Sequence, residues 1–180
     1  MNVLLENDAK YVIREVVEGL NYLSTHNIMH RDIKLDNILA TRKQNNQGFY
    51  ITDYEFKLGD MGLAKSMNSP NAMNDTFAGT PLAMAPELLN GNKYSYKADV
   101  WSLGTLLFQI LAGHHPFTGR NMTELKQNLK AGAYKIPKNI EISMNCIDFL
   151  NSCLRFDYVQ RSDWEQLKQH DFLAGSNFDN

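Results

Sequence analysis

The chain has 180 residues, 43% hydrophobic and 21% charged, a balance typical of one ordinary globular domain. Its formal net charge of -2 argues against a general nucleic-acid binder or a basic membrane-surface protein. No apolar stretch reaches the ~20 residues that span a bilayer, and the first ten residues lack the features of a signal peptide. We therefore expect a soluble intracellular protein, located in the cytoplasm.

The chain begins with a segment that predicts an amphipathic helix. Asp8 is a suitable N-cap, and the helix is expected to end near His26 and Asn27. Residues 30–37, HRDIKLDN, then gather six charged or amide side chains in one short loop. By itself this stretch has two interpretations: a solvated surface loop, or a loop whose charges carry out chemistry. The apolar positions that define the helix are Val12, Ile13, Val16, Val17, Leu20 and Leu23.

The next part of the chain favours strands and loops. Residues 41–48, TRKQNNQG, are polar and predict an exposed loop. In residues 49–60, FYITDYEFKLGD, aromatic and β-branched residues lie on both sides of Thr52-Asp53, which predicts a small β-hairpin that turns there. Residues 65–80 show no periodicity, so we expect a long loop, and loops of this length are usually functional or mobile.

The second half is predicted to be helical. The segment 97–112 is apolar nearly all round, which is typical of a helix buried in the middle of a domain. Shorter helices are predicted at residues 122–130, 142–154 and 163–170, separated by Pro116 and Pro137. Nothing indicates an internal repeat or a second domain.

The cysteines and the paired histidines do not predict a disulfide or a metal site. Cys146 and Cys153 lie seven residues apart on a predicted helix, so their backbones would be ~10.5 Å apart, beyond the ~7 Å reach of a disulfide. We expect two buried free thiols. His114 and His115 are adjacent and lack the spacing of a helical metal site, so we interpret them as loop residues.

Three motifs follow one another in an informative order. HRDIKLDN at 30–37, GDMG at 59–62 and GTPLAMAPE at 79–87 resemble the catalytic loop, the metal-binding loop and the end of the activation segment of the protein kinase family. The resemblance extends from about residue 6 to residue 173 and includes DVWSLG at 99–104. It implies a mainly α fold: the carboxy-terminal, large lobe of a kinase with small β-hairpins. Residues 1–180 would then be a partial kinase domain with its activation segment at 60–87.

The resemblance also assigns roles at the site. Phosphoryl transfer is catalysed mainly by positioning and charge neutralisation. Asp32 would orient the substrate hydroxyl and accept its proton, and Lys34 would place a cation near the transferred phosphoryl group. Asn37 and Asp60 would bind Mg²⁺, a hard cation that takes oxygen ligands alongside water and nucleotide phosphates. Leu39 would form the apolar floor beneath the adenine of ATP.

Other matched residues are expected to be architectural. His30 and Asp99 would hold the catalytic loop on the central helix. Glu87 would form a buried ion pair with Arg161, and loss of one partner of such a pair costs ~3–5 kcal/mol.

Substrate class and regulation are implied by residues around the expected base. Lys34 and Thr80 resemble serine/threonine kinases, whereas tyrosine kinases usually carry alanine and arginine after the catalytic aspartate. The Thr80 hydroxyl would bridge Asp32 and Lys34. Thr76 lies where the family often has an activating phosphorylation site, and Arg31 would face that phosphate; the alternative is an ordinary exposed threonine. The expected partners are ATP and proteins bearing serine or threonine, with no nucleic acid.

Two departures from the family qualify these expectations. Met61 stands where the family usually has phenylalanine, and we expect it to fill the same slot and loosen the switch between active and inactive forms. The glycine-rich loop, the strand lysine with its glutamate partner and the hinge are not found, so we expect the amino-terminal β lobe to be absent. The chain would then be one lobe of a longer kinase, weakly active or inactive alone.

Alternatives to the kinase interpretation remain. A non-catalytic module would use the exposed cleft to dock a partner. A nucleotide-binding protein outside the kinases is disfavoured because the sequence has no G-x-x-x-x-G-K-[ST] loop. The insert between Leu39 and Lys57 resembles that of the Unc-51-like kinases.

Overall fold

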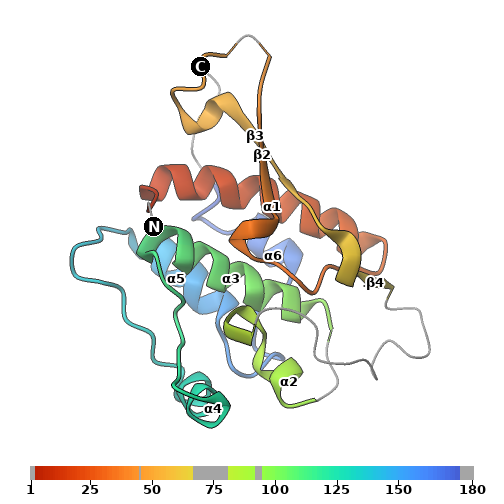
Figure 1. Ribbon diagram of the computed structural model, residues 1–180, viewed down its shortest axis with the longest axis vertical. Helices are drawn as coiled ribbons and strands as arrows, with labels where there is room; N and C mark the ends of the chain where they lie inside the picture. Colours follow the sequence, from red (N-terminus) through yellow and green to blue (C-terminus); the bar gives the residue numbers. More distant parts are fainter. Residues whose placement is uncertain (1–2, 45, 67–80, 92–94, 175–180) are drawn as a thin grey trace.

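The computed structural model describes residues 3–44, 46–66, 81–91 and 95–174. It is mainly helical, with two small antiparallel sheets, β1–β4 and β2–β3, in the described part of the chain. Figure 1 shows α1 and α3 crossing the middle of the molecule, with α2 and α4 at one end and the β2–β3 hairpin at the other. The elements are α1 Glu6–Thr25, β1 Ile28–Met29, η1 Leu35–Asn37, β2 Ile38–Arg42, η2 Ile51–Asp53, β3 Tyr54–Leu58, η3 Met61–Leu63, β4 Lys65–Ser66, η4 Pro81–Ala83, α2 Pro86–Leu89, α3 Lys97–Ala112, α4 Met122–Ala131, α5 Met144–Cys153 and α6 Trp164–Lys168.

Helix α1 begins earlier than its sequence predicts. Leu5 occupies the N-cap position without a side-chain hydrogen bond, so the prediction of Asp8 as N-cap is wrong. Asp8 lies instead in the first turn, where its negative charge interacts favourably with the helix dipole. The other end is as expected: the helix stops at Thr25, and Asn27 adopts a left-handed conformation, with φ 56°, that turns the chain into β1.

Helix α3 has the predicted bounds and forms the centre of the core. Trp101, Leu103 and Leu107 are completely buried, which agrees with a helix that is apolar nearly all round. A Cβ added at Gly104 would lie 2.7 Å from Cβ of Cys153 on α5. The absence of a side chain at Gly104 therefore lets α3 and α5 approach closely.

The observed β-hairpin pairs different strands from the hairpin predicted within residues 49–60. Ile38 pairs with Leu58 and Arg42 with Tyr54, so the partner of β3 is the segment that follows the catalytic loop. The predicted turn at Thr52-Asp53 is wrong, because residues 51–53 form the short helix η2. The backbone N–H groups of residues 48–50 donate to the Asp53 carboxylate and are therefore not available to a strand ladder.

A second small sheet was not expected from the sequence. Lys65 and Ser66 form β4, which pairs with Ile28 and Met29 of β1, although the sequence predicted a loop over the whole of 65–80. The remainder of that predicted loop lies outside the described residues.

The carboxy-terminal helices match their predictions except at the ends. α5 begins at Met144 because the Ser143 side chain accepts a hydrogen bond from the Cys146 amide. Cys146 and Cys153 are both free and buried, as predicted. Burial raises the pKa of each thiol to about 12. Within the described residues, no helix combines the length and the apolar character that crossing a membrane requires.

Candidate active site

Asp99 of α3 holds the start of the catalytic loop. Its Oδ2 accepts a hydrogen bond from the His30 amide at 2.8 Å, and its Oδ1 accepts one from the Arg31 amide at 2.9 Å. Burial raises the pKa of the Asp99 carboxyl, although the two amide hydrogen bonds act in the opposite direction. Arg31 is left-handed, with φ 69°, so the two bonds keep the loop in a conformation that non-glycine residues rarely adopt.

The His30 ring joins the catalytic loop to the segment before Asp60. Its Nδ1 accepts from the Asp32 amide at 3.3 Å, and its Nε2 lies 3.0 Å from the Gly59 carbonyl oxygen. Since a carbonyl can only accept, these partners assign the ring proton to Nε2 of a neutral imidazole. The Gly59 amide in turn donates to the Asn37 carbonyl at 2.8 Å. Gly59 is thereby bonded to both ends of the loop, and Asp60 follows directly.

Asp32, Lys34 and Asn37 form one hydrogen-bonded cluster. The Lys34 ammonium donates to Asp32 Oδ2 at 2.6 Å, and Asn37 Nδ2 donates to the same oxygen at 3.0 Å and to the Asp32 carbonyl at 2.7 Å. The hydrogen bond to Asp32 raises the pKa of Lys34, and the negative charges of Asp36 and Asp60 add to the effect. Lys34 is therefore cationic at neutral pH. The bonds among these three residues use Asp32 Oδ2 and the Asn37 amide nitrogen, and they do not involve Asp32 Oδ1 or Asn37 Oδ1.

Asp60 lies at the exposed side of this cluster. It is left-handed, with φ 55°, and its Oδ1 accepts from the Gly62 amide at 3.1 Å. The negative charge of Asp60 contributes to the raised pKa of Lys34. Asp60 is therefore close enough to the Asp32–Lys34–Asn37 cluster to interact with it electrostatically. Met61 is 44% exposed and does not fill a buried slot in this structure.

Asn37 and Asp60 are the residues that could hold Mg²⁺, as part of a coordination shell that other groups complete. Among the described residues, no group of three His, Cys, Asp or Glu side chains could hold an ion. Asn37 and Asp60 offer two oxygen ligands, and Mg²⁺ usually completes its shell with water and substrate phosphates.

Leu39 provides an apolar surface beside the same segment. It is 56% exposed, and its Cδ1 would lie 2.8 Å from a Cβ added at Gly59. Leu39 thus packs directly over the glycine that precedes Asp60, and its outer face stays open to water.

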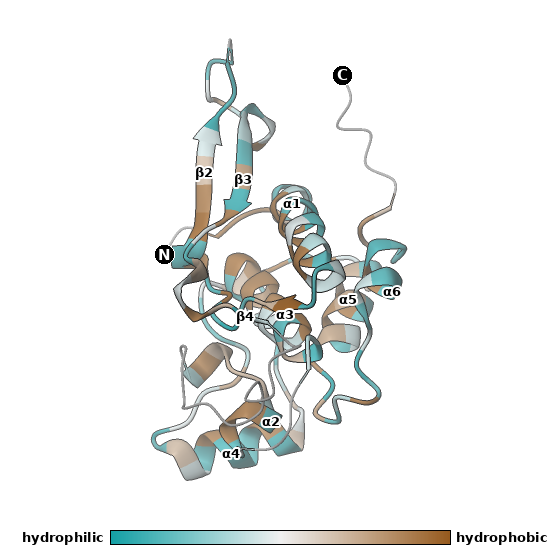
Figure 2. Cartoon of the chain, turned by 90° about the vertical axis from the view of Figure 1, so that its right-hand side faces the viewer, coloured by the Kyte–Doolittle hydropathy of each residue, from teal (hydrophilic) through white to brown (hydrophobic). Residues whose placement is uncertain are grey.

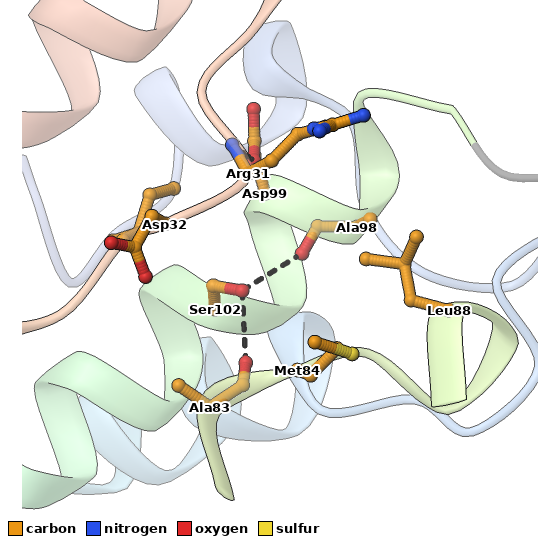
Figure 3. A pocket seen from close by; sticks show the side chains of 9 residues that line it. Arg31, Asp32, Ala83, Met84, Leu88, Ala98, Asp99 and Ser102 are labelled. Carbon is orange, nitrogen blue, oxygen red and sulfur yellow. Dashed lines mark hydrogen bonds between the residues drawn. The ribbon is translucent and has the colours of Figure 1, made fainter. Parts of the chain in front are cut away.

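A small hollow lies beside Asp32 (Figure 3). Its volume is about 10 Å³, room for about one water molecule. The Ser102 hydroxyl lies within hydrogen-bond distance of the carbonyl oxygens of Ala83, at 2.9 Å, and Ala98, at 3.3 Å, and so ties the 81–85 segment to α3. Sequence reasoning missed Ser102, although a buried hydroxyl within an apolar helix was an available signal. The lining residues are Arg31, Asp32, Ile33, Ala83, Met84, Leu88, Ala98, Asp99 and Ser102.

Glu87 and Arg161 form a buried pair that fastens α2 to the core. Arg161 Nη1 and Nη2 donate to the two Glu87 carboxylate oxygens at 2.7 and 3.0 Å. Arg161 also donates to the carbonyls of Lys97 and Arg155, and its guanidinium lies 5.1 Å from the centre of the Trp101 ring. The Arg161 guanidinium is therefore paired with the Glu87 carboxylate and hydrogen-bonded to two backbone carbonyls within the core.

The threonines predicted to take part in catalysis and regulation, Thr80 and Thr76, lie outside the described residues. Arg31 Nε donates to the Leu63 carbonyl at 2.9 Å, next to the end of η3.

Comparison with known proteins gives a consistent result. A family model, "Protein kinase domain", matches residues 1–173. The chain is 36% identical to the serine/threonine-protein kinase ATG1c of Arabidopsis thaliana, over 96% of this chain and 23% of that protein. It is 37% identical to the putative serine/threonine-protein kinase R517/R518 of Acanthamoeba polyphaga mimivirus, over 92% of this chain and 39% of that protein. It is 34% identical to atg1 of Dictyostelium discoideum, over 98% of this chain and 25% of that protein.

These matches have two consequences. The chain spans between about a quarter and two fifths of the length of these curated relatives. Two of the three are ATG1 kinases, in agreement with the resemblance to the Unc-51-like group. The order of the motifs, the joined loops and the matched domain lead to one conclusion: this chain belongs to the protein kinase family.

Proposed function

We propose that this chain is the carboxy-terminal lobe of an intracellular kinase that transfers the γ-phosphate of ATP to serine or threonine hydroxyls of proteins. The observation that carries the proposal is the cluster of Asp32, Lys34 and Asn37, connected through Gly59 to Asp60. A solvated surface loop would give no reason for two side chains, Lys34 and Asn37, to converge on one carboxylate oxygen of Asp32.

Each residue has a distinct role in this proposal. Asp32 Oδ1 accepts the proton of the substrate hydroxyl while Oδ2 is held by Lys34 and Asn37. Lys34 stabilises negative charge on the transferred phosphoryl group, since its raised pKa keeps it protonated. Asn37 Oδ1 and the Asp60 carboxylate would hold Mg²⁺. When bound, Mg²⁺ would neutralise the phosphate charges of ATP.

The open side of the site supports the view that this lobe acts together with a further part of a longer protein. Leu39 is 56% and Met61 44% exposed, and the Asp60 carboxylate lies at the surface. A nucleotide on this face would stay in contact with water, where charge interactions are weak. We propose that a second lobe covers it.

A non-catalytic docking module is the second candidate. The exposed apolar surface of Leu39 and Met61 favours it, because such surface often marks a binding site. Docking alone, however, gives no reason for the Asp32–Lys34–Asn37 cluster, and we therefore favour the enzyme.

The test is phosphate transfer from radiolabelled ATP to a serine/threonine peptide library by the full-length protein. Asp32→Asn should lower the rate by ~10²–10⁴-fold, the usual contribution of a positioned proton acceptor. Asp36→Asn is the matched control, because Asp36 is exposed, lies in the same loop and should leave the rate within about twofold. Unchanged activity in Asp32→Asn, with wild-type affinity for ATP, would refute the proposal.

A further inference from the structure

Two side chains of α3, three residues apart, each bind a different part of the candidate site. Asp99 accepts hydrogen bonds from the amides of His30 and Arg31, at 2.8 and 2.9 Å, and so fixes the start of the catalytic loop. The Ser102 hydroxyl donates to the Ala83 carbonyl at 2.9 Å, in the segment that precedes α2. Residues three apart on a helix lie on the same face. One face of α3 therefore anchors both parts (Figure 3).

The helix that carries these two anchors is buried over most of its length. Figure 2 shows α3 in the middle of the molecule, largely in the brown of hydrophobic residues. Trp101 and Leu103, on either side of Ser102, are completely buried, and Ser102 itself is only 7% exposed. Protein interiors are close-packed, so a helix in this position has little freedom to shift. The spacing between the two anchored parts is therefore fixed by the spacing of Asp99 and Ser102 along α3.

The Ser102 hydroxyl has two carbonyl oxygens within reach but only one proton to donate. The Ala83 oxygen lies at 2.9 Å, and the Ala98 oxygen, four residues earlier in α3, lies at 3.3 Å. A serine inside a helix often bonds only to the carbonyl four residues earlier. Here the shorter bond leads to another segment. Between described residues, Ser102 supplies the one side-chain hydrogen bond that joins residues 81–85 to a different element.

Close packing does not set the distance between the catalytic loop and the 81–85 segment at this point. The hollow of about 10 Å³ lies between them, with Asp32 on the loop side and Ala83 and Met84 on the segment side. Ser102 lines the same hollow. Because the two parts are separated by room for about one water molecule, their relative position depends on the anchors on α3.

We infer that Ser102 is a positioning residue for the protein substrate: it holds the 81–85 segment at the distance from Asp32 that a bound peptide requires. The inference rests on the proposed function, in which Asp32 accepts the proton of a serine or threonine hydroxyl. A peptide with its hydroxyl at Asp32 must lie against the surface beside that residue. In the neighbouring segment, Pro81 is exposed and Leu82 is partly exposed, so both are accessible to a peptide. A misplacement of about 1 Å can cost ~10²-fold in rate, so the position of this segment matters for transfer.

The nucleotide side of the candidate site is held by a separate set of bonds. Asn37 Nδ2 donates to Asp32 Oδ2 at 3.0 Å, and the Gly59 amide donates to the Asn37 carbonyl at 2.8 Å. Neither of these bonds involves Ser102 or the segment that precedes α2. Loss of the Ser102 hydroxyl should therefore impair phosphate transfer to a peptide and spare the binding of ATP.

The test compares Ser102→Ala with the wild-type full-length protein in phosphate transfer from radiolabelled ATP. We expect kcat/KM for a peptide substrate to fall by ~10–100-fold, whereas the KM for ATP and the hydrolysis of ATP without peptide should stay within about twofold. Thr105→Val is the matched control, because Thr105 is 1% exposed on the same helix and donates to the Ser102 carbonyl at 2.8 Å. This change removes a buried hydroxyl of α3 without touching residues 81–85, so kcat/KM should stay within about twofold.

Amide hydrogen exchange gives a second measurement that needs no catalysis. The Met84 amide donates to the Pro81 carbonyl at 3.3 Å, within the segment that Ser102 anchors. This amide should exchange faster in Ser102→Ala than in Thr105→Val, because only the first change releases the segment.

The outcomes separate this inference from the proposed function. Unchanged peptide kinetics or unchanged exchange in Ser102→Ala overturns the inference, as does an equal loss in Thr105→Val or a loss that extends to ATP hydrolysis. With an active wild-type protein, any of these results overturns the inference alone. A wild-type protein that phosphorylates no peptide refutes the proposed function and this inference with it.

Discussion

The catalytic loop has two sides that differ in how completely their polar groups are satisfied. Toward α3, Asp99 bonds to two amides, and Glu87 with Arg161 forms a buried pair with every charge compensated. On the opposite side, Asp60 and Leu39 are exposed beside the same loop. Among the described residues, the loop is therefore supported by buried hydrogen bonds on one side, whereas the proposed nucleotide face on the other side is open to water.

The largest expected effect concerns that open face. If a second lobe covers this face, as we propose, the 180-residue chain alone should transfer phosphate at least ~10⁴-fold more slowly than a protein that includes that lobe, since each charge-stabilising donor that the lobe supplies is worth ~10²–10³-fold. Single-turnover assays with radiolabelled ATP at saturating Mg²⁺ measure this ratio. Turnover of the short chain within tenfold of the full-length rate would contradict our view that the face needs a cover.

On the side of the loop that faces α3, the Glu87→Ala change should destabilise the folded chain by ~3–5 kcal/mol, because Arg161 would be left buried without its partner. Urea unfolding followed by circular dichroism measures the change. Glu18→Gln is the control: it removes the exposed pair with Lys168 and should cost less than ~1 kcal/mol. Equal costs for the two variants would mean that the buried pair contributes no more than a surface one.

Helix packing under the loop should respond to Gly104→Ala. The new methyl group would meet Cβ of Cys153 at 2.7 Å and atoms of Leu154 at 3.0 Å, so α3 and α5 must separate. Such overpacking costs ~1–3 kcal/mol, and thermal unfolding detects it. Gly19→Ala is the matched control, because a Cβ there meets nothing within 4 Å, and helix propensity predicts a stabilisation of up to ~1 kcal/mol.

The last prediction concerns the buried thiols, whose effect on stability is small near neutral pH. Their folded-state pKa of about 12 lies above the usual 9.0, so the unfolded chain loses its thiol protons first as the pH rises. Stability should therefore fall with increasing pH from about 9 toward 12. A Cys146→Ala, Cys153→Ala variant should show a shallower slope in urea unfolding over this range. Rapid alkylation of the native chain by iodoacetamide at pH 8 would contradict the burial of both thiols.

Sequence patterns predicted the helical part of this fold well and the strand pairing poorly. α3 was predicted with its observed bounds because it is apolar all round and lies between polar segments. The start of α1 was missed because its N-cap, Leu5, has no capping side chain. The pairing of β3 with β2 was missed because the connection 43–53 separates the two strands, whereas the sequence pattern placed both strands of a hairpin within residues 49–60.

The candidate site could be proposed from sequence because its residues lie in a few short motifs. The position of Gly59 between His30 and Asn37 could not, since that contact depends on how β3 returns alongside β2. Ser102 and the hollow beside Asp32 also required the packing of the 81–85 segment on α3. Contacts between segments that are far apart in the sequence cannot be predicted from local sequence patterns.

Gly59 has one further consequence for the dynamics of the protein. If Asp60 swings away from the catalytic loop, the bonds of Gly59 to His30 and Asn37 must both break, at a net cost of ~1 kcal/mol each. A difference of ~2 kcal/mol corresponds to an outward-swung population of roughly 3%. A ligand that binds only the outward form would thus find a small population already present. The free energy of the two hydrogen bonds is the amount by which its apparent affinity is reduced.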